Sequence, residues 1–335
     1  MERKRLLTGD RPTGPLHLGH YVGSLQNRLK LQSEYETFII IADVQALTDN
    51  YANPDKVRAN VLEVYKDYYA VGLDFTKVHI FIQSLIPEIA ELTIFFTNLV
   101  SHAEVLRNPT VKTEILEKDL TSRVPLGFVM YPVSQAADIL FCKANLVPVG
   151  QDQAPMIEIA KDIALRFNKI YKTDIFPTPQ ALFGNVSRLV GTDGNAKMSK
   201  SLGNVINLNS TTEHVKKQVM SMYTDPTRIH TTDKGKVESN PVFIYHNIFN
   251  DNSAEVKDLE DRYREGKVGD KEVKEKLFLA LEKFLNPIRD RRAIIEKKSP
   301  QELLADLIES TNYVRKIAKQ TLIEVKEAMK INYEG

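Results

Sequence analysis

The sequence predicts an α/β protein in which a parallel sheet is followed by a part that is helical only. Strand-like apolar runs alternate with helical patterns over residues 4–101, an order typical of a doubly wound sheet. The apolar run at 37–43 indicates a strand that is buried on both faces, as in parallel sheets. From Thr211 onward only helical patterns with charged faces appear. We therefore expect a sheet domain over residues 1–205 and a helical domain over residues 206–335.

The first elements are marked by their ends and by their spacing. A short apolar run at 4–9 ends in glycine and predicts the first strand. A helix is expected over 16–31, because apolar residues recur there at helical spacing: Leu18, Val22, Leu25 and Leu29. After the strand at 37–43, a second helix is expected over 57–71, because it follows Asn53-Pro54, a pair that favours a turn before a helix.

The rest of the sheet domain follows the same alternation. Residues 108–125 are polar, and residues 177–195 are rich in Pro, Gly and Asn, so both stretches are expected to be irregular. A helix is expected to begin at Pro132, because proline suits a first helical turn. The remaining strands and helices are expected at 78–83, 87–101, 146–150 and 152–167.

The helical part has a start signal, a long last helix and a basic cluster. Residues 210–213, Ser-Thr-Thr-Glu, have the spacing of a capping box. The last helix, 301–329, is a candidate to pack back on the sheet domain. The densest basic cluster combines residues 289–292 with residues 297–298. We interpret it as a solvated helix face rather than as a contact to nucleic-acid phosphate.

Composition excludes several classes of protein. Of 335 residues, 42% are hydrophobic and 27% are charged, which excludes a disordered chain. Lys and Arg number 45 against 44 Asp and Glu, so a nucleic-acid partner has to be met by a local patch. The longest apolar run, 38–42, is far too short for a membrane span, and no secretion signal is visible, so we expect a cytoplasmic protein. The single cysteine, Cys142, excludes an internal disulfide and a cysteine-rich zinc site. We interpret it as a structural thiol, in the core or at the surface, and not as a nucleophile.

The strongest chemical signal is the segment 9–20. Its three glycines allow the backbone to approach a ligand closely, and Pro15 suits the first turn of the helix that follows. His17 and His20 are three residues apart and share a face near the helix N-terminus, where phosphate is favoured. Two imidazole donors there would stabilise charge on a transferred phosphoryl group.

A second signal lies far along the chain, at 193–204. It is a glycine-flanked loop with Lys197 and Lys200, and such lysines can close over a polyphosphate as it leaves. Residues 12–20 resemble the "HIGH" signature of class I aminoacyl-tRNA synthetases, and residues 197–201 match the KMSKS loop of that family letter for letter. The resemblance covers nearly the whole chain. It implies a Rossmann-like (HUP-type) catalytic domain and a helical anticodon-binding domain.

The resemblance also implies a reaction in two steps with ATP and Mg²⁺. The amino acid carboxylate attacks the α-phosphate of ATP to give an aminoacyl-adenylate and pyrophosphate, and the acyl group then passes to tRNA. In-line attack at phosphorus needs alignment and charge neutralisation more than a covalent nucleophile. Apart from the Mg²⁺ that accompanies ATP, no metal cluster held by the protein is expected. The implied catalytic residues are His17, His20, Lys197 and Lys200. The implied ATP-binding residues are Arg11, Pro12, Thr13, Gly19, His20, Gly150, Gln151, Asp152, Lys197, Met198, Ser199, Lys200 and Ser201.

The segment 128–140 bears on which amino acid is activated. Gln135 and Asp138 share a helix face, and the two alanines between them leave space beside an aromatic ligand. A buried carboxylate there fits an indole N–H and a phenol O–H equally well. Residues 137–140 and 147–153 resemble the tryptophan enzymes of the family, in which this Asp receives the indole N–H.

The resemblance therefore implies a tryptophan–tRNA ligase that acts as a homodimer on L-tryptophan, ATP and tRNA(Trp). The apolar stretch 92–100 is a candidate dimer interface. The implied tryptophan-binding residues are Asp138, Gln135, Tyr131, Gln153, Val147, Val149, Gln45 and Leu7.

Several residues depart from the common pattern of the tryptophan enzymes. Gln151 stands where they have Glu. Many bacterial members carry Met at the position of Gln135, Asn at that of His20 and His at that of Gln45. The chain thus resembles a divergent branch, for which we expect an altered polarity of the pocket and a changed response to indole-based inhibitors.

Three other functions stay open at this point. The spacing Tyr131-x3-Gln135-x2-Asp138 equals that of the substrate triad in tyrosine–tRNA ligases, although the intact KMSKS loop favours the tryptophan enzymes. A catalytically silent synthetase-like protein with a binding or regulatory role is a second alternative. A small-molecule adenylyltransferase with the same nucleotide signature is the third, and the helical second part argues against it.

Overall fold

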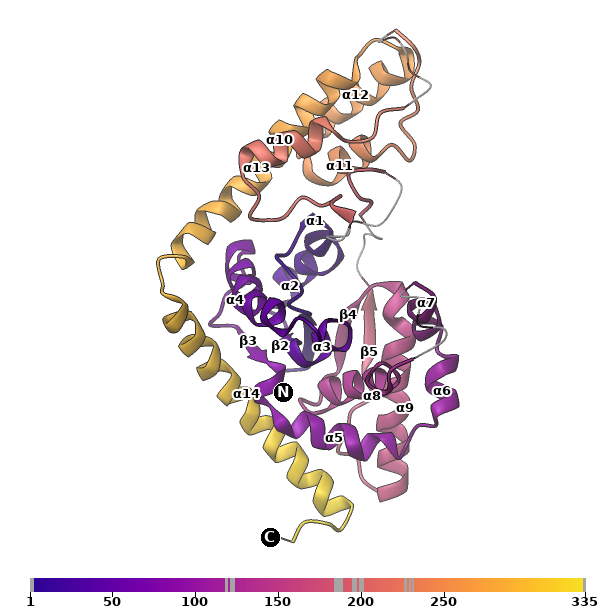
Figure 1. The fold of residues 1–335 in the computed structure, drawn as a ribbon, viewed down its shortest axis with the longest axis vertical. Helices are drawn as coiled ribbons and strands as arrows, with labels where there is room; N and C mark the ends of the chain where they lie inside the picture. The colour runs from indigo at the N-terminus through magenta and orange to yellow at the C-terminus, as the bar shows by residue number, and fades with distance from the viewer. Residues whose placement is uncertain are drawn as a thin grey trace.

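A parallel sheet forms the centre of the molecule (Figure 1). The computed structural model describes residues 3–117, 120, 124–183, 189–194, 198, 202–225, 228, 230 and 232–333. Over these residues the sheet has five parallel strands in the order β3-β2-β1-β4-β5. They are β1 (Arg5–Asp10), β2 (Glu36–Ile41), β3 (Val78–Ile82), β4 (Leu146–Val149) and β5 (Gln180–Phe183). The expected α/β class with a Rossmann-like sheet is confirmed.

Helices precede and follow these strands, and only helices follow residue 211 in the described part of the chain. None of the described helices combines the length and the apolarity that a membrane crossing requires. The helices around the sheet are α1 (Leu18–His20), α2 (Gln26–Leu31), α3 (Asp43–Asn50), α4 (Pro54–Val71), α5 (Pro87–Thr97), α6 (His102–Arg107), α7 (Pro109–Glu117), α8 (Leu126–Leu140) and α9 (Ala154–Tyr171). The later helices are α10 (Thr212–Met220), α11 (Pro241–Phe249), α12 (Ser253–Glu265), α13 (Asp270–Ile295) and α14 (Pro300–Ala328).

The two faces of the sheet bury different residues of β2. Ile39 and Ile41 belong to the core that α4 covers, whereas Phe38 and Ile40 belong to the core that α5, α8 and α9 cover. This burial on both faces confirms the interpretation of the apolar run at β2. The first core continues through the helical part as far as the start of α14, so that part packs directly against the sheet domain.

β5 corrects the expectation of a loop over 177–195. Residues 180–183 pair in parallel with β4, with Ala181 opposite Val147. The strand is short, only partly buried and preceded by two prolines, which is compatible with an edge strand. Its local composition therefore resembled that of a loop.

The helix after β1 begins later than the sequence predicted. His17 is the N-cap of α1, so Pro15 lies in the preceding loop and not in the first turn. A π-helical turn at Tyr21–Leu25 then connects α1 to α2. Such turns are rare and occur often beside functional sites.

α7 and α8 differ from the helices that we expected on the basis of polar composition and of Pro132. α7 lies within residues 108–125, which we expected to be irregular. α8 begins at Leu126, so Pro132 lies inside the helix and not at its start. Proline removes one hydrogen bond of a helix, but Phe128 and Ala136 of α8 are fully buried, and this packing offsets the loss.

α10 starts one residue later than its expected capping signal. Thr211 is the N-cap, and its Oγ1 accepts a hydrogen bond from the backbone N of His214 at 3.3 Å. The predicted capping box between Ser210 and Glu213 is therefore wrong, because the threonine one position later takes the role.

α14 covers the outer edge of the sheet (Figure 1). β3 is the strand at that edge, and the backbone N of Ile82 donates a hydrogen bond to Oγ1 of Thr311 at 3.2 Å. An ion pair of 3.0 Å between Arg315 and Glu88 fastens α14 to α5. A covered edge strand is protected from pairing with another chain.

Candidate active site

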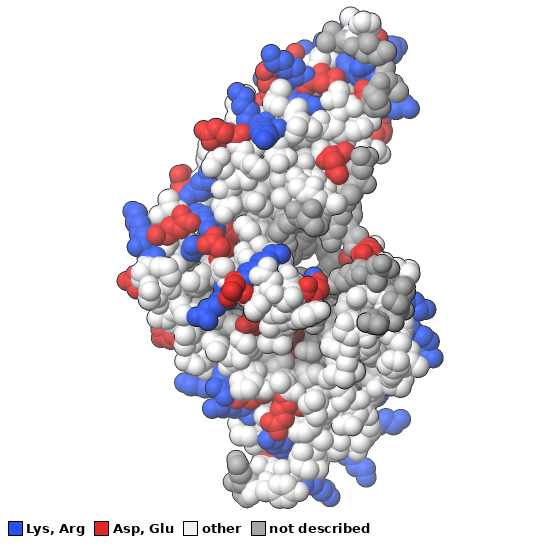
Figure 2. Space-filling view, in the orientation of Figure 1, with Lys and Arg blue, Asp and Glu red and all other residues white. Residues whose placement is uncertain are grey.

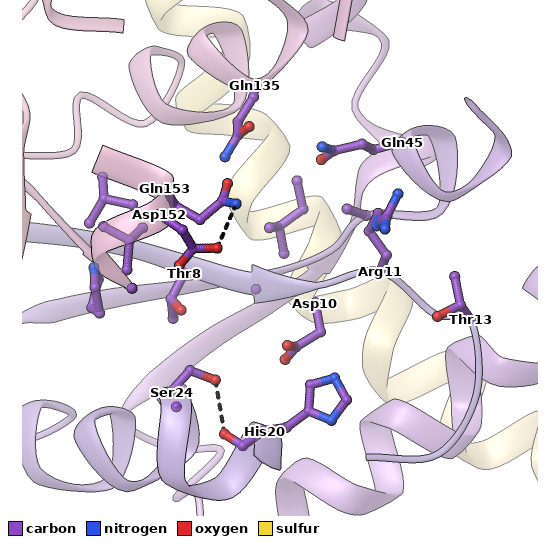
Figure 3. Close-up of a pocket in the computed structure, with 18 of the residues that line it drawn as sticks. Thr8, Asp10, Arg11, Thr13, His20, Ser24, Gln45, Gln135, Asp152 and Gln153 are labelled. Carbon is purple, nitrogen blue, oxygen red and sulfur yellow. Dashed lines mark hydrogen bonds between the residues drawn. The ribbon is translucent and has the colours of Figure 1, made fainter. Parts of the chain in front are cut away.

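The carboxyl ends of β1, β2 and β4 open into a cavity of about 1340 Å³. Its walls include Asp10 and Arg11 at the end of β1, Ala42 after β2 and Gly150 after β4. Ligands of doubly wound sheets bind at this edge. Figure 2 shows the molecule hollowed between the upper helices and the lower part, and Figure 3 shows the side chains around the cavity.

Many of the residues expected to bind ligands line this cavity. From the expected nucleotide site these are Arg11, Thr13, His17, Gly19, His20, Gly150, Gln151, Asp152 and Met198. From the expected amino acid site they are Leu7, Gln45, Gln135, Asp138, Val147, Val149 and Gln153. Pro12 and Tyr131 are buried instead. The expected residues that lie outside the described part of the chain are Lys197, Ser199, Lys200 and Ser201.

The two histidines cap the start of α1, the helix that follows the loop of residues 11–16, here called the nucleotide loop. Nδ1 of His17 accepts a hydrogen bond from the backbone N of Gly19, and Nδ1 of His20 accepts one from the backbone N of His17, both at 3.1 Å. The rings are tilted against each other with centroids 3.8 Å apart. Because Nδ1 is an acceptor in both rings, the ring proton is placed on Nε2, where it can be donated to a phosphate oxygen.

The segments of the two sequence motifs lie side by side. The backbone N of Gly19 is 3.3 Å from Sδ of Met198, which is buried. Leu18 N donates to Ile206 O at 3.0 Å, and Leu208 N donates to Leu16 O at 2.9 Å. Met198 and residues 206–208 therefore lie at the start of α1, although the sequence separates them from it by almost the whole sheet domain.

Asp138 is a buried carboxyl group in the wall of the cavity. It is only 3% exposed, and Nε2 of Gln83 donates to its two oxygens at 2.8 and 3.0 Å. Burial raises the pKa of Asp138 to about 8, against the opposing effect of the Gln83 hydrogen bond. The neighbouring wall is apolar, with Leu7, Ile139 and Val147. An aromatic ring that carries one N–H or O–H donor fits this combination.

Gln83 was missed by the sequence analysis. It follows β3 directly, at the same edge of the sheet as the cavity, and is itself buried. Its Oε1 accepts the backbone N of Gln45 at 3.0 Å, so the amide joins α3 to Asp138 on α8. The position just after the third strand was the signal that could have found it, because ligands gather at that edge.

Other glutamines face the cavity from different elements. Gln135 projects from α8, Gln45 from α3 and Gln153 from the turn before α9 (Figure 3). Tyr131 lies inside α8 and not at its entrance, and its ring packs edge-on against Phe128 with centroids 5.2 Å apart. The expected helix face of Gln135 and Asp138 is thus present, while Tyr131 is turned into the core.

A buried ion pair lies behind the nucleotide loop, and it too was not anticipated. Asp10 accepts hydrogen bonds from Nη1 of Arg28 at 2.6 Å and from the hydroxyl of Tyr68 at 2.8 Å. Arg28 is 1% exposed and also donates to the carbonyl of Gly9 at 3.0 Å. Burial raises the pKa of Asp10, but the charge of Arg28 outweighs it, and the pKa is held at about 2. Asp10 is therefore a fixed negative charge beside His20 (Figure 3).

The basic cluster forms the expected solvated face only in part: Lys297 and Lys298 are exposed, whereas the arginines of 289–292 are not. Arg289 pairs with Glu282 at 2.8 Å within α13, and Arg291 Nε donates to the carbonyl of Ala70 at 2.6 Å. Arg292 is buried and binds carboxylates of α4. These arginines bind acidic groups and carbonyl oxygens of the protein, and Arg291 and Arg292 thereby fasten α13 to α4.

Cys142 is fully buried, and burial raises the pKa of its thiol to about 12. This agrees with the interpretation of a structural thiol. Within the residues that the structure describes, no three His, Cys, Asp or Glu side chains gather in a group that could hold a metal ion.

Comparison with known proteins agrees with the geometry of the site. Residues 1–286 match the family model of the class I tRNA synthetases (W and Y). The chain is 49% identical to a protein named Tryptophan–tRNA ligase from Clostridium longisporum, over 99% of this chain and 98% of the relative. It is 49% identical to the ligase of the same name from Borreliella burgdorferi, over 98% of this chain and 93% of the relative.

A solved structure is similar over nearly the whole chain. It is tryptophanyl-tRNA synthetase from Campylobacter jejuni, complexed with ADP and tryptophan, and its TM-score is 0.85 at 30% sequence identity. The match covers 97% of this chain and 99% of that chain. The chain belongs to the class I tRNA synthetases (W and Y).

Proposed function

We propose that this chain is a tryptophan–tRNA ligase, which joins L-tryptophan to tRNA(Trp) at the expense of ATP. The observation that carries the proposal is the buried Asp138 beside the apolar side chains Leu7, Ile139 and Val147, in a chain whose relatives are named Tryptophan–tRNA ligase. An indole ring buries a large apolar surface and offers one N–H donor. A buried acceptor that is left unpaired by the wrong amino acid gives strong discrimination.

The amino acid is placed at the apolar end of the cavity. Asp138 receives the ring N–H, and Gln83 holds its carboxylate in position. Val147 and Leu7 line the wall beside it, and Gln135 and Gln153 approach from α8 and from the turn before α9. Gln45 and Val149 also belong to this proposed subsite, with Tyr131 behind it.

ATP is placed over the start of α1. His17 and His20 present Nε2–H donors at a helix N-terminus, where phosphate is favoured, and the backbone from Arg11 to Thr13 lines the nucleotide side with Gly19. Gly150, Gln151 and Asp152 line the opposite wall, at the place proposed for the ribose. Mg²⁺ enters with the phosphates of ATP and neutralises part of their charge.

The transfer of the adenylyl group needs alignment and charge stabilisation. The carboxylate of tryptophan attacks the α-phosphorus, a new P–O bond forms, and the bond to pyrophosphate breaks. We assign the stabilisation of the departing pyrophosphate to Lys197 and Lys200. The contact of Met198 with Gly19 supports this assignment, because Met198 lies between the two lysines in the sequence and next to the histidines in the structure.

We further propose that residues 1–205 form the catalytic domain and residues 206–335 the part that binds the anticodon. On the face in Figure 2, basic and acidic side chains are interspersed over the upper helices, so a tRNA contact there has to be local. Ligation of tRNA serves translation, which places the enzyme in the cytoplasm.

A homodimer is proposed over α5. Within the stretch 92–100, Leu92 and Phe96 are buried in the core, whereas Ile94 is 56% exposed. The exposed side of α5 is therefore available to a second copy of the chain, and replacement of Ile94 by Asp would yield a monomer by light scattering.

The experiment that tests the function is ATP–pyrophosphate exchange, with L-tryptophan and L-tyrosine supplied separately. Exchange with tryptophan alone supports the proposal. Exchange with tyrosine alone would show that the spacing of Tyr131, Gln135 and Asp138 determines a tyrosine–tRNA ligase. Exchange with neither would favour a silent, regulatory protein. Binding of free tryptophan could then be followed by its own fluorescence, because the chain contains no tryptophan residue.

A further inference from the structure

Asp67 is a buried carboxylate that connects the nucleotide loop to α13. The side chain has no exposed surface, and its Oδ2 accepts the backbone N of Leu16 at 2.7 Å. Its Oδ1 accepts Nη1 of Arg292 at 2.5 Å. One carboxylate on α4 thus holds two segments that are far apart in the sequence.

Leu16 is the residue immediately before His17, the cap of α1. Its side chain is buried, and its carbonyl accepts the backbone N of Leu208 at 2.9 Å. The bond from Leu16 to Asp67 therefore fixes the last residue of the loop before the two histidines. A substitution of Asp67 therefore removes a hydrogen bond of the loop without removing any of the side chains that line the cavity.

Arg292 holds Asp67 from the other side. It is buried near the end of α13, and its guanidinium also bonds Glu63 of α4 and, at 2.8 Å, Glu296. α13 extends from the upper helices down to α4 (Figure 1). α13 is thus connected to the backbone of Leu16 through two side chains, the guanidinium of Arg292 and the carboxylate of Asp67.

We propose that Asp67 is a positioning residue for ATP, which holds the loop before His17 through Leu16 and ties its position to α13 through Arg292. This inference rests on the proposed function, because it takes ATP as the ligand of the loop. Neither Asp67 nor Arg292 is among the described residues that line the cavity. Both act on the nucleotide site only through the backbone of Leu16.

The carboxyl group of Asp67 changes its charge within a moderately acidic pH range. Burial raises its pKa to about 6, although Arg292 of α13 and the N–H of Leu16 favour the charged form and Glu63 on its own helix opposes it. Below this pH the carboxyl group takes up a proton, and its ion pair with Arg292 is lost. The hold on the loop should weaken under the same conditions.

The test measures ATP–pyrophosphate exchange of the full chain in Asp67→Asn and Arg292→Met. Asparagine has the size of aspartate but offers one acceptor oxygen to two donors. The matched control is Arg315→Met, which breaks an ion pair with the buried Glu88 of α5 and leaves the loop untouched. The KM for ATP, the KM for tryptophan and the melting temperature are recorded for each protein.

The proposal expects the KM for ATP to rise by about fivefold or more in both variants, because Asp67→Asn leaves a buried donor unpaired and Arg292→Met leaves the buried carboxylate of Asp67 without its counter-charge. The KM for tryptophan should stay at the wild-type value in both variants, and the control should keep both KM values of the wild type. In the double variant Asp67→Asn/Arg292→Met, the KM for ATP should be no higher than in Asp67→Asn. An unchanged KM for ATP overturns the proposal. So does an equal rise of both KM values, which a merely structural role would produce.

A pH profile gives the second readout. The KM for ATP of the wild type should rise as the pH falls through about 6, and that of Asp67→Asn should lack this component. ATP and histidines also gain protons in this range, so the difference between the two proteins is decisive. Parallel profiles overturn the proposal. If the wild type shows no exchange, the proposed function fails, and calorimetric binding of ATP to the same proteins then decides the role of Asp67 separately.

Discussion

The backbone N–H of His17 donates to the ring of His20, while the ring of His17 caps the backbone N of Gly19. The two signature histidines therefore close the start of α1 in a reciprocal arrangement, like a capping box built from imidazoles. Nδ1 of each ring serves the fold, and the proposed function assigns Nε2 to the phosphates of ATP. The two roles can be separated by mutation.

His17→Asn should retain the cap and lose the chemistry. The Oδ1 of asparagine occupies the place of Nδ1, but nothing replaces the Nε2–H. We expect exchange to fall by roughly 10²-fold or more, as on removal of one donor to a developing negative charge, with an unchanged melting temperature. His17→Ala should show the same loss and, in addition, lower the stability by about 1 kcal/mol. If both variants melt alike, the cap contributes nothing.

Asp138→Asn should stabilise the ligand-free protein at alkaline pH. The pKa of Asp138 is raised from 3.8 to about 8, so its contribution to stability is lost as the pH rises from about 4 to about 8. An amide has no such cost. We expect the melting temperature of the variant to exceed that of the wild type at pH 8, by an amount worth a few kcal/mol, and the excess to shrink at pH 5.

The control for this pH dependence is Asp290→Asn, an exposed aspartate on α13. It should change the melting temperature little at either pH. The same Asp138→Asn protein should activate tryptophan poorly, because its amide presents a donor to the indole N–H. A variant that is more stable and equally active would contradict the role of Asp138 in the substrate site.

Gln83→Met should weaken tryptophan binding without touching the nucleotide site. Methionine has a similar size but donates nothing to Asp138, so the buried carboxyl group loses its partner. We expect the KM for tryptophan to rise by about tenfold and the KM for ATP to stay constant in the exchange assay. An equal effect on both KM values would mean that Gln83 only supports the fold, for example through its bond to Gln45.

The sequence predicted the elements whose local pattern agrees with their environment. The apolar run of β2 could only be a strand buried on two faces, and the alternation around it predicted the parallel sheet. The predicted helix start at Pro132 was wrong, because the packing of α8 outweighs the hydrogen bond that a proline inside a helix removes. β5 was missed since an edge strand needs little apolar surface.

The candidate site divides in the same way. Residues on short motifs, such as His17, His20 and Asp138, were predicted because the spacing of a motif is visible in one stretch of sequence. Gln83 and Arg28 were missed because each acts through a partner on another element. Such pairs arise only when the sheet brings distant segments together.

The ion pair of Arg28 with Asp10 should determine the stability of the nucleotide loop. Arg28→Met leaves the carboxylate of Asp10 with a hydrogen bond from the hydroxyl of Tyr68 on α4 but without its counter-charge, and an unpaired buried charge costs about 3–5 kcal/mol. The pKa of Asp10 is lowered to about 2, so the wild-type pair stabilises the fold above about pH 4 and is lost as the pH falls through about 2. Urea unfolding at pH 7 should show the loss in Arg28→Met and a partial recovery in Asp10→Asn/Arg28→Met, because the second change removes the uncompensated charge. If the double variant is no more stable than Arg28→Met, the charge of Asp10 is not what makes Arg28 necessary.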